Sequence, residues 1–253
     1  MTRFGYTMMC EQAPPAQLVR DVRRAEEAGF DFSVISDHYQ PWLESQGHSG
    51  YAWAVLGAAA QATERIPLMT YVTCPIIRYH PVVVAQKAAT VQELSGGRFR
   101  LGLGAGENLN EHVVGRGWPT AGVRHEMLEE AVGIIRDLLD GGRVDRRGAH
   151  YDVSSARLWD LPEERVPIGI AVSGASSCRL AGEHADLMIA TEPKPELGAM
   201  FDEAGGAGKP RVGQVAVSYD ADRDRAVRRA HEQFRWFGLG WNVNTDLPNP
   251  ESF

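Results

Sequence analysis

The stretch EEAGFDFSVISDHYQPW (residues 26–42) contains the end of a helix, a strand and a polar loop in direct succession. Gly29 is typical of a helix end, and the apolar run at 32–36 is typical of a buried strand. Residues 36–42 then place a carboxylate, an imidazole, a phenol, an amide and an indole in one turn. A helix, a strand and a polar loop in this order indicate one unit of a parallel α/β fold.

The same alternation extends over most of the 253-residue chain. Strands are predicted at 4–9, 32–36, 66–72, 99–104, 167–172, 187–191 and 212–219. Helices are predicted at 15–29, 51–64, 81–96, 125–142, 176–185, 195–206 and 220–238. Strict alternation predicts a mostly parallel sheet covered by helices. The length suits a single (β/α)8 TIM barrel, which has roughly 250 residues.

The pattern is one unit short of a closed barrel. Its last segment, GLGWNVNTDLPNPESF (residues 238–253), has two prolines and is a poor strand. We therefore expect one barrel domain over residues 1–253 that lacks the sequence for an eighth strand. The natural chain is expected to continue past Phe253, and the chain alone to be unstable or prone to aggregation. The insert at 143–166 is either a small hairpin or a surface loop.

Composition argues against several classes of function. The net charge is −7 and no Lys/Arg run reaches five residues, so binding to nucleic acid or to a membrane surface has little support. The amino terminus lacks the apolar core of roughly 7–15 residues that a signal peptide needs. No apolar stretch approaches the roughly 18 residues of a transmembrane helix. The three cysteines form no Cys-x-x-Cys pair, so we expect a reduced, cytoplasmic protein without a disulfide framework or a zinc site.

Polar side chains follow two of the predicted strands directly. Asp37, His38 and Trp42 follow the second strand, and Glu107 and Asn110 follow the fourth. Ligands of parallel α/β folds bind at the carboxyl ends of the strands, so we expect these side chains to share one face. A histidine base and a carboxylic acid that act on different atoms are a common pair in catalysis. Taken singly, His38 and Trp42 also fit packing roles, and Asp37 also fits a turn or a cap.

The turn SGASS (residues 173–177) follows the fifth strand and leads into a helix. Gly174 lets the backbone approach a ligand, and the next N–H groups point outward at the start of the helix. The turn can therefore cradle a phosphate. The alternative is an ordinary helix cap made by Ser176 or Ser177.

Two further readings of the sequence are excluded. GLGAGENLNE (residues 102–111) has its glycines spaced G-x-G-x-G, and no helix is predicted directly after them. A dinucleotide-binding fold requires G-x-G-x-x-G at a strand–helix turn. The histidines form no H-x-x-x-H or H-E-x-x-H pattern, so no metal site is expected.

Four stretches together resemble the luciferase-like oxidoreductases. They are residues 26–42, YVTCPIIRYHPVVVAQKAAT (71–90), GRFRLGLGAGENLNEHVVG (97–115) and AVSGAS (171–176). The chain is most similar to the coenzyme F420-dependent branch, which includes the F420-dependent glucose-6-phosphate dehydrogenases. The resemblance runs from about residue 3 to the end and keeps the order of the four motifs.

The resemblance implies a (β/α)8 barrel, often dimeric, that binds an 8-hydroxy-5-deazaflavin with a phosphate and a polyglutamate tail. It implies that Asp37 contacts the deazaflavin and that His38 is the base that takes the proton of a substrate hydroxyl. It implies that Trp42 lines the substrate side and that Glu107 protonates the ring nitrogen as hydride reaches C5. Asn110 would help to bind the cofactor or the substrate.

The resemblance also assigns the backbone around the cofactor. It implies that a non-proline cis peptide falls at Tyr71–Val72, beside the cofactor. The residues implied to hold the phosphate are Ser173, Gly174, Ala175 and Ser176. The sugar-phosphate dehydrogenases bind the phosphate of their substrate partly through basic residues, and Lys194 falls near one such position. The substrate itself is expected only as an alcohol or its carbonyl counterpart.

Three functions stay open at this point. The first is an F420-dependent oxidoreductase that acts on a small-molecule alcohol or carbonyl, expected as a homodimer. The second is a flavin mononucleotide (FMN)-dependent, luciferase-like monooxygenase that activates oxygen. The third is a non-catalytic deazaflavin-binding protein, which would need the phosphate turn but not the pair His38 and Glu107.

Overall fold

The centre of the fold is a curled sheet of seven strands in the order β1-β2-β3-β4-β7-β8-β9. The computed structural model describes residues 2–192 and 194–253. Every pairing in this sheet is parallel. The strands are β1 (Gly5–Met8), β2 (Phe32–Ile35), β3 (Leu68–Thr70), β4 (Phe99–Leu103), β7 (Ile168–Val172), β8 (Leu187–Ala190) and β9 (Arg211–Gly213).

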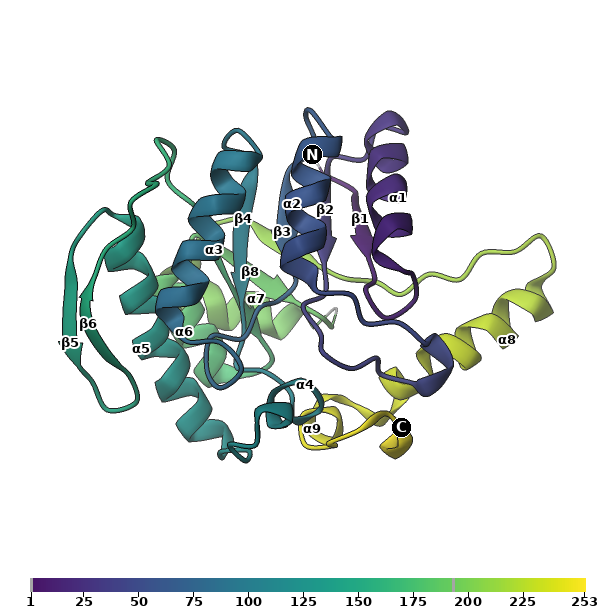
Figure 1. Cartoon of the computed structure of the whole chain (residues 1–253). Coiled ribbons are helices and arrows are strands. Elements are labelled where there is room, and N and C mark those ends of the chain that lie inside the picture. Colours follow the sequence, from purple (N-terminus) through teal and green to yellow (C-terminus); the bar gives the residue numbers. More distant parts are fainter. Residues whose placement is uncertain (1, 193) are drawn as a thin grey trace.

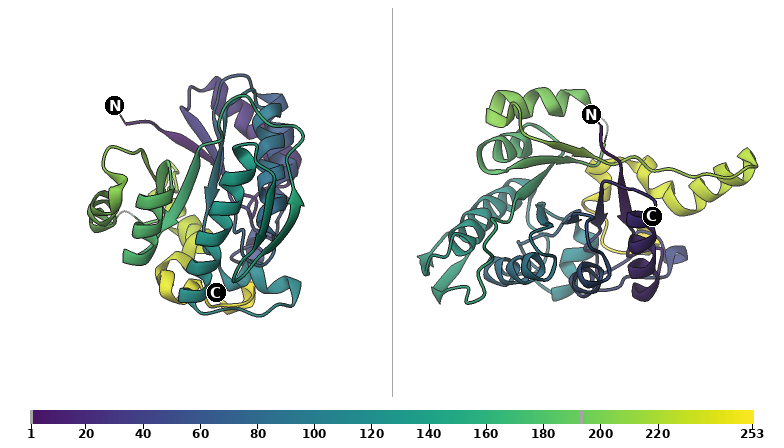
Figure 2. Two further views of the ribbon diagram at one scale, coloured as in Figure 1. Left: turned by 90° about the vertical axis from the view of Figure 1, so that its left-hand side faces the viewer. Right: turned by 90° about the horizontal axis from the view of Figure 1, so that it is seen from above.

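Helices cover the outer side of the curled sheet, as the view from above shows (Figure 2). These helices are α1 (Pro15–Glu27), α2 (Ala52–Ala62), α3 (Pro81–Leu94), α5 (Ala121–Leu139), α6 (Ala175–His184) and α7 (Pro195–Phe201). Three more, α4 (Asn108–Glu111), α8 (Arg223–Phe234) and α9 (Trp241–Asn244), lie near the lower edge of the sheet or project from it (Figure 1). Among the described residues, no helix is both long and apolar enough to cross a membrane.

The sheet is a TIM barrel of the luciferase-like type that lacks one strand. β1 and β9 are the two ends of the strand order and do not pair with each other. This confirms the predicted fold class. Successive side chains of each strand point to opposite sides of such a sheet, so every strand contributes side chains to both the outer and the inner face.

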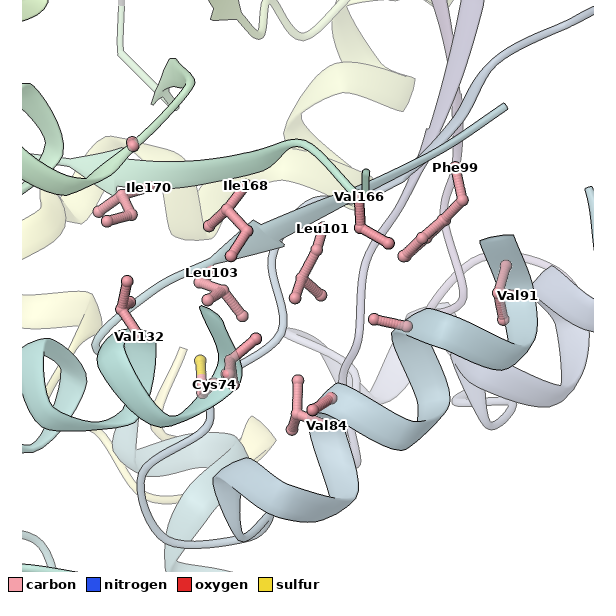
Figure 3. Packing of buried hydrophobic residues seen from close by; sticks show 14 of the residues in the cluster. Cys74, Val84, Val91, Phe99, Leu101, Leu103, Val132, Val166, Ile168 and Ile170 are labelled. Carbon is pink, nitrogen blue, oxygen red and sulfur yellow. The ribbon is translucent and has the colours of Figure 1, made fainter. Parts of the chain in front are cut away.

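The outer face carries the main hydrophobic core, and the inner face carries a smaller one. Leu101 and Leu103 of β4 face α3 and α5, next to Ile168 and Ile170 of β7 (Figure 3). Gly102 lies between the two leucines on the inner face, where a Cβ atom would overlap the carbonyl oxygen of Thr70. The inner core consists of Val34, Met69, Tyr71, Leu187 and Ile189.

The predicted strand at 212–219 is wrong beyond Gly213. Its last pairing is the bond from the amide of Gln214 to the carbonyl of Ala190, where β8 ends. A strand forms only where its backbone has a neighbour to pair with, and β8 offers none past that residue. The apolar side chains of the following segment are exposed instead, with Val215 at 74%, Val217 at 76% and Tyr219 at 84%.

Three other predictions are settled by the elements. The insert forms an antiparallel hairpin of β5 (Val144–Arg147) and β6 (Asp152–Ala156), so the hairpin alternative is confirmed. The absence of a helix directly after the glycine loop is wrong, because α4 begins at Asn108, although it spans only four residues. The predicted last helix ends at Phe234, and a 3₁₀ segment (Arg235–Leu239) follows it.

Candidate functional site

A cavity of about 800 Å³ lies at the carboxyl ends of the strands. Every strand of the sheet contributes to its wall through the residues that directly follow it. These residues include Glu11 after β1, His38 after β2, Tyr71 and Val72 after β3, Glu107 after β4, Ser173 after β7, Thr191 after β8 and Gln214 after β9. The cavity is within the size range of pockets that bind cofactors and drug-sized ligands.

His38 stands at this cavity in contact with a buried carboxylate. Its Nδ1 lies 2.6 Å from Oε1 of Glu11, whose side chain is 1% exposed. The hydroxyl of Ser36 donates to Oε2 of the same carboxylate at 2.7 Å. Burial would lower the pKa of His38, but the negative charge of Glu11 at this short distance, aided by that of Glu107, raises the pKa above its ordinary value. Glu11 was missed in the sequence because its partner is 27 positions away, with no local motif to mark it.

Asp37 lies beside His38 but is buried behind the cavity wall, at 2% exposure. The indole of Trp53 donates to Oδ2 at 3.0 Å, and the hydroxyl of Thr73 donates to the same oxygen at 2.7 Å. The hydroxyl of Tyr79 donates to Oδ1 at 3.1 Å, and Arg78 contacts the same oxygen at 3.3 Å. Asp37 is not among the residues that line the cavity. Its predicted contact with the deazaflavin therefore stays a prediction.

Arg78 joins two buried carboxylates on neighbouring loops. Its guanidinium contacts Asp37 at 3.3 Å and Glu111 at 3.4 Å. The backbone amide of Arg78 also donates to Glu111 at 2.8 Å. Burial outweighs these contacts and raises the pKa of Glu111 to about 7. No local pattern in the sequence links Arg78 to Glu111, because the two residues are 33 positions apart.

Asn110 lies on the short helix α4, and Glu107 lies in the turn directly before this helix. Glu107 lines the cavity and is 7% exposed. Asn110 is 1% exposed, and its Oδ1 accepts hydrogen bonds from the amides of Tyr39 and Gln40. Its Nδ2 is buried without a partner. Asn110 thus holds the loop after His38, and a direct contact with cofactor or substrate stays a prediction.

Trp42 belongs to an aromatic cluster that the sequence did not reveal. Its ring stacks on Trp236 at a centroid distance of 4.2 Å and an angle of 6°. The ring of His38 meets Trp42 edge-on at 5.3 Å. Phe253 and Trp241 complete the cluster from the end of the chain. Trp42 is 3% exposed yet lines the cavity, and its place on the substrate side stays a prediction.

The peptide bond between Tyr71 and Val72 is cis, which confirms the position that the resemblance implied. Both residues line the cavity. The hydroxyl of Tyr71 donates to the carbonyl of Ala190 at 2.7 Å, across the interior of the sheet. Val72 packs against the backbone at Gly104, where a Cβ atom would come within 2.6 Å of its side chain.

The turn after β7 leads into α6, as predicted. Ser177, in the first turn of α6, ties the turn to the helix, because its hydroxyl accepts from the amides of Ser173 at 2.9 Å and Gly174 at 3.2 Å. Ser173, Ala175 and Ser176 are exposed, and Ser173 lines the cavity. Neither Ser176 nor Ser177 is the N-cap residue, because that position is Gly174 and it makes no side-chain cap bond. The phosphate role of the turn stays a prediction.

Arg124 and Lys194 differ in their position and in their partners. Arg124 of α5 lines the cavity and is 6% exposed, and its Nε is buried without a hydrogen bond. No local pattern in the sequence marks this residue. Lys194 is half exposed and pairs with Glu192 at 2.7 Å. Within the described residues, the one group that could hold a metal ion is Glu129, Glu183 and His184, which lies outside the cavity wall.

Known proteins resemble the chain over most of its length. The F420-dependent glucose-6-phosphate dehydrogenase of Microbacterium testaceum (strain StLB037) is 42% identical over 90% of this chain and 71% of its own length. The enzyme of the same name from Nakamurella multipartita is 40% identical over 89% of this chain and 70% of its own length. A solved F420-dependent secondary alcohol dehydrogenase, in complex with an F420–acetone adduct, is 32% identical, with a TM-score of 0.93, over 99% of this chain and 79% of its own.

More distant structures share the fold. The coenzyme F420-dependent tetrahydromethanopterin reductase of Methanopyrus kandleri is 23% identical, with a TM-score of 0.75, over 89% of this chain and 69% of its own. The sequence pattern that defines the family of luciferase-like monooxygenases matches residues 1–251 of this chain. The match covers nearly the whole chain, and the barrel that lacks one strand has the fold of these relatives. The chain therefore belongs to the luciferase-like monooxygenase family.

Proposed function

We propose that this chain is a coenzyme F420-dependent oxidoreductase that moves a hydride between C5 of the deazaflavin and the carbon of an alcohol or carbonyl substrate. The names of its relatives and of the most similar solved structure described above support the cofactor and the class of reaction. One geometric observation carries the proposal further. His38 stands at the cavity with Nδ1 held by the buried carboxylate of Glu11, which leaves Nε2 for a substrate.

The cavity fits a cofactor that carries an anionic group. Nε of Arg124 is buried at the wall without a partner, and the exposed turn Ser173–Ser176 lies at the start of α6. A buried guanidinium and the N–H groups at a helix start both favour a phosphate. Tyr71 and Val72 provide the wall for the ring system. When bound, the deazaflavin supplies a carbon centre that exchanges hydride without oxygen chemistry.

His38 acts as the base in the direction of alcohol oxidation. Its Nε2 takes the proton of the substrate hydroxyl, while the hydride leaves the carbon that bears this hydroxyl. The imidazole becomes positively charged, and the carboxylate of Glu11 at 2.6 Å stabilises that charge. The side chain of Glu107 lies at the cavity wall and is the acid proposed for the ring nitrogen. Trp42 lines the substrate side and fixes the orientation of His38 through its edge-on contact.

Asp37 and Asn110 fit a supporting role in this scheme. The carboxylate of Asp37 already receives hydrogen bonds from Trp53, Thr73 and Tyr79. The amide oxygen of Asn110 already accepts from the loop that follows His38. Both residues thus hold the loop 36–42 at the mouth of the sheet. Either side chain could contact the cofactor only through an atom that takes no part in these bonds. Nδ2 of Asn110, which has no hydrogen-bond partner, is such an atom.

The decisive experiment compares cofactors and substrates on the purified chain. Calorimetric titration with F420 and with FMN is expected to show binding of F420 only. Turnover is then followed by the loss of deazaflavin absorbance with propan-2-ol and, separately, with glucose 6-phosphate. Equal or tighter binding of FMN would overturn the cofactor assignment. Binding of F420 without turnover of any alcohol or carbonyl would instead support a non-catalytic deazaflavin-binding protein.

A further inference from the structure

Lys87 of α3 holds its ammonium group in a box of aromatic rings. Nζ lies 3.3 Å from the ring centroid of Tyr79, 5.2 Å from that of Tyr51 and 5.5 Å from that of Trp53. These distances are all within the range of cation–π attraction. Nζ is buried and has no hydrogen-bond acceptor. The faces of the three rings are therefore its partners among the described residues.

A buried ammonium group without a hydrogen-bond acceptor is unusual in proteins, because the loss of its hydration is not compensated. Its desolvation disfavours the charged form, so burial lowers the pKa of Lys87 to about 8. The negative charge of Asp37 opposes that shift, and the positive charge of Arg78 adds to it. An apolar side chain of the same length would fill the space at a lower cost. Packing alone therefore does not explain why this position holds a charged side chain.

Two of the three rings also hold Asp37. The hydroxyl of Tyr79 donates to Oδ1 of Asp37 at 3.1 Å, and the indole N–H of Trp53 donates to Oδ2 at 3.0 Å. A cation over an aromatic ring attracts its electrons and makes the attached O–H or N–H a stronger donor. Lys87 is therefore placed to strengthen two hydrogen bonds to a carboxylate that it does not touch.

We propose that Lys87 is a positioning residue. Through the rings of Tyr79 and Trp53, its positive charge tightens the hydrogen bonds that hold Asp37, and so orients the loop that carries His38. The catalytic consequence deepens the proposed function and rests on it. The coupling between Lys87 and the loop is a property of the chain itself and can be measured without the cofactor.

The coupling depends on pH because Lys87 loses its charge within an accessible range. The charged and titratable groups that face it are Asp37 and Arg78 in the loops and Tyr51 and Tyr79 in the box. Burial raises the pKa of both Tyr51 and Tyr79, so neither phenol ionises first. As pH rises through about 8, Lys87 becomes neutral and the two hydrogen bonds to Asp37 weaken.

The test on the chain alone uses nuclear magnetic resonance. The indole N–H signal of Trp53, assigned with a Trp53→Phe variant, and the amide signals of Tyr39 and Gln40 are followed from pH 6 to 10. In the wild type, all three are expected to shift with a common midpoint near pH 8. In Lys87→Met, which keeps an unbranched apolar chain, this midpoint is expected to vanish. In Lys87→Arg, which keeps the charge, the signals are expected to stay in the low-pH position throughout.

A missing midpoint in the wild type, or the same midpoint in Lys87→Met, would overturn the proposal. The second outcome would assign the titration to another group, such as His38. Melting curves of all variants establish that they are folded. Lys87→Met is expected to be at least as stable as the wild type at pH 7, because it removes the cost of the buried charge.

The test on the enzyme measures kcat against pH with F420 and an alcohol. The wild type is expected to lose activity above pH 8, and Lys87→Met is expected to lack this decline. At pH 7 its kcat should be lower by roughly 3- to 30-fold, the range of one desolvated cation–π contact, with the Kd for F420 nearly unchanged. An active Lys87→Met variant that keeps the wild-type alkaline decline would refute the positioning role. A wild type without any turnover would refute the proposed function, while the resonance experiment still decides the coupling.

Discussion

Buried carboxylates determine the properties of the individual side chains at the mouth of the sheet. Glu11 is 1% exposed, Asp37 2% and Glu111 0%. Each has a specific partner, namely His38 for Glu11 and Arg78 for the other two. Removal of one member of such a pair leaves an uncompensated buried charge, which typically costs about 3–5 kcal/mol. Conservative substitutions that keep the shape and change the charge can therefore separate the residues proposed to be catalytic from the supporting ones.

His38→Ala is expected to abolish turnover with little effect on the binding of F420. A base acts in the transition state, so the loss falls on kcat and should reach roughly 10²–10⁴-fold. Glu107→Gln should behave similarly if it is the acid. Stopped-flow turnover and calorimetric Kd values measure the two quantities separately. A near-normal kcat in His38→Ala, on a substrate that the wild type uses, would show that the assignment of the base is wrong.

Glu11→Gln is expected to move the pH profile of alcohol oxidation to lower pH and to lower its plateau. Glu11 raises the pKa of His38, so its loss lets the imidazole become a neutral base at lower pH. The plateau falls because a neutral amide stabilises the charged imidazole less. The measurement is kcat/KM against pH, and the exposed Glu44→Gln serves as the control. An unshifted acidic limb in Glu11→Gln would contradict the assignment.

The same pair makes stability depend on pH, with a defined sign. His38 has a raised pKa in the folded chain, so its contribution to stability is present below its unfolded value of roughly 6.5. That contribution is lost as pH rises through the folded pKa. Urea unfolding of the wild type above pH 6.5 should therefore show a decline that is shallower in Glu11→Gln. Equal slopes would mean that the two groups are not coupled.

At the scale of elements, close approach between neighbouring strands restricts the residue at Gly102. The carbonyl of Thr70 and the side chain of Ile189 leave no space for a Cβ atom there. Tyr71, one residue after β3, spans the interior of the sheet to Ala190, the last residue of β8. The position of the wall residues Tyr71 and Val72 therefore depends on how closely β3 and β4 pack.

Gly102→Ala is expected to destabilise the fold by about 1–3 kcal/mol, because an added methyl group overpacks the inner face. Gly122→Ala, on the exposed first turn of α5, is the matched control, since nothing lies within 4 Å of its added Cβ atom. That variant should change stability by less than about 1 kcal/mol, in the stabilising direction. Chemical denaturation of both variants measures the difference. Equal stability of the two variants would show that the strands can separate to accept the methyl group.

At the scale of the whole molecule, the open side of the sheet leaves one edge of β1 and one edge of β9 without a strand neighbour. β1 and β9 end the strand order, and the segment after β9 exposes Val215, Val217 and Tyr219 beside that opening. Exposed edges with apolar side chains pair with other chains. We therefore predict that the chain associates with itself through this side.

Val217→Lys is expected to lower this association, because a charge on an exposed edge opposes pairing. Sedimentation at several concentrations should show a smaller share of oligomer than in the wild type. Val114→Lys, at an exposed valine between α4 and α5, is the control for the added charge. If both variants associate as the wild type does, the contact lies elsewhere on the surface.

Local patterns in the sequence determined the strand–helix order, the seven parallel strands and the placement of His38, Glu107 and Trp42 at one mouth. Each of these follows from residues within one turn or one strand, where periodicity and spacing report directly on structure. The resemblance added the cis bond at Tyr71–Val72. The segment 214–219 shows the limit of such patterns, because its alternating side chains fit a strand and only the absence of a neighbour past Ala190 prevents one.

The partners of the candidate site were decided by the tertiary structure alone. Glu11 meets His38 because β1 and β2 are neighbours, and Glu111 meets Arg78 because β3 and β4 are. Lys87 reaches the rings that hold Asp37 only through the packing of α3 against α2 and the loop after β3. Charges like these leave no periodic signal along the chain. Their pKa values depend on burial and on distances across the fold, and both exist only once the sheet has curled and brought the strand ends together.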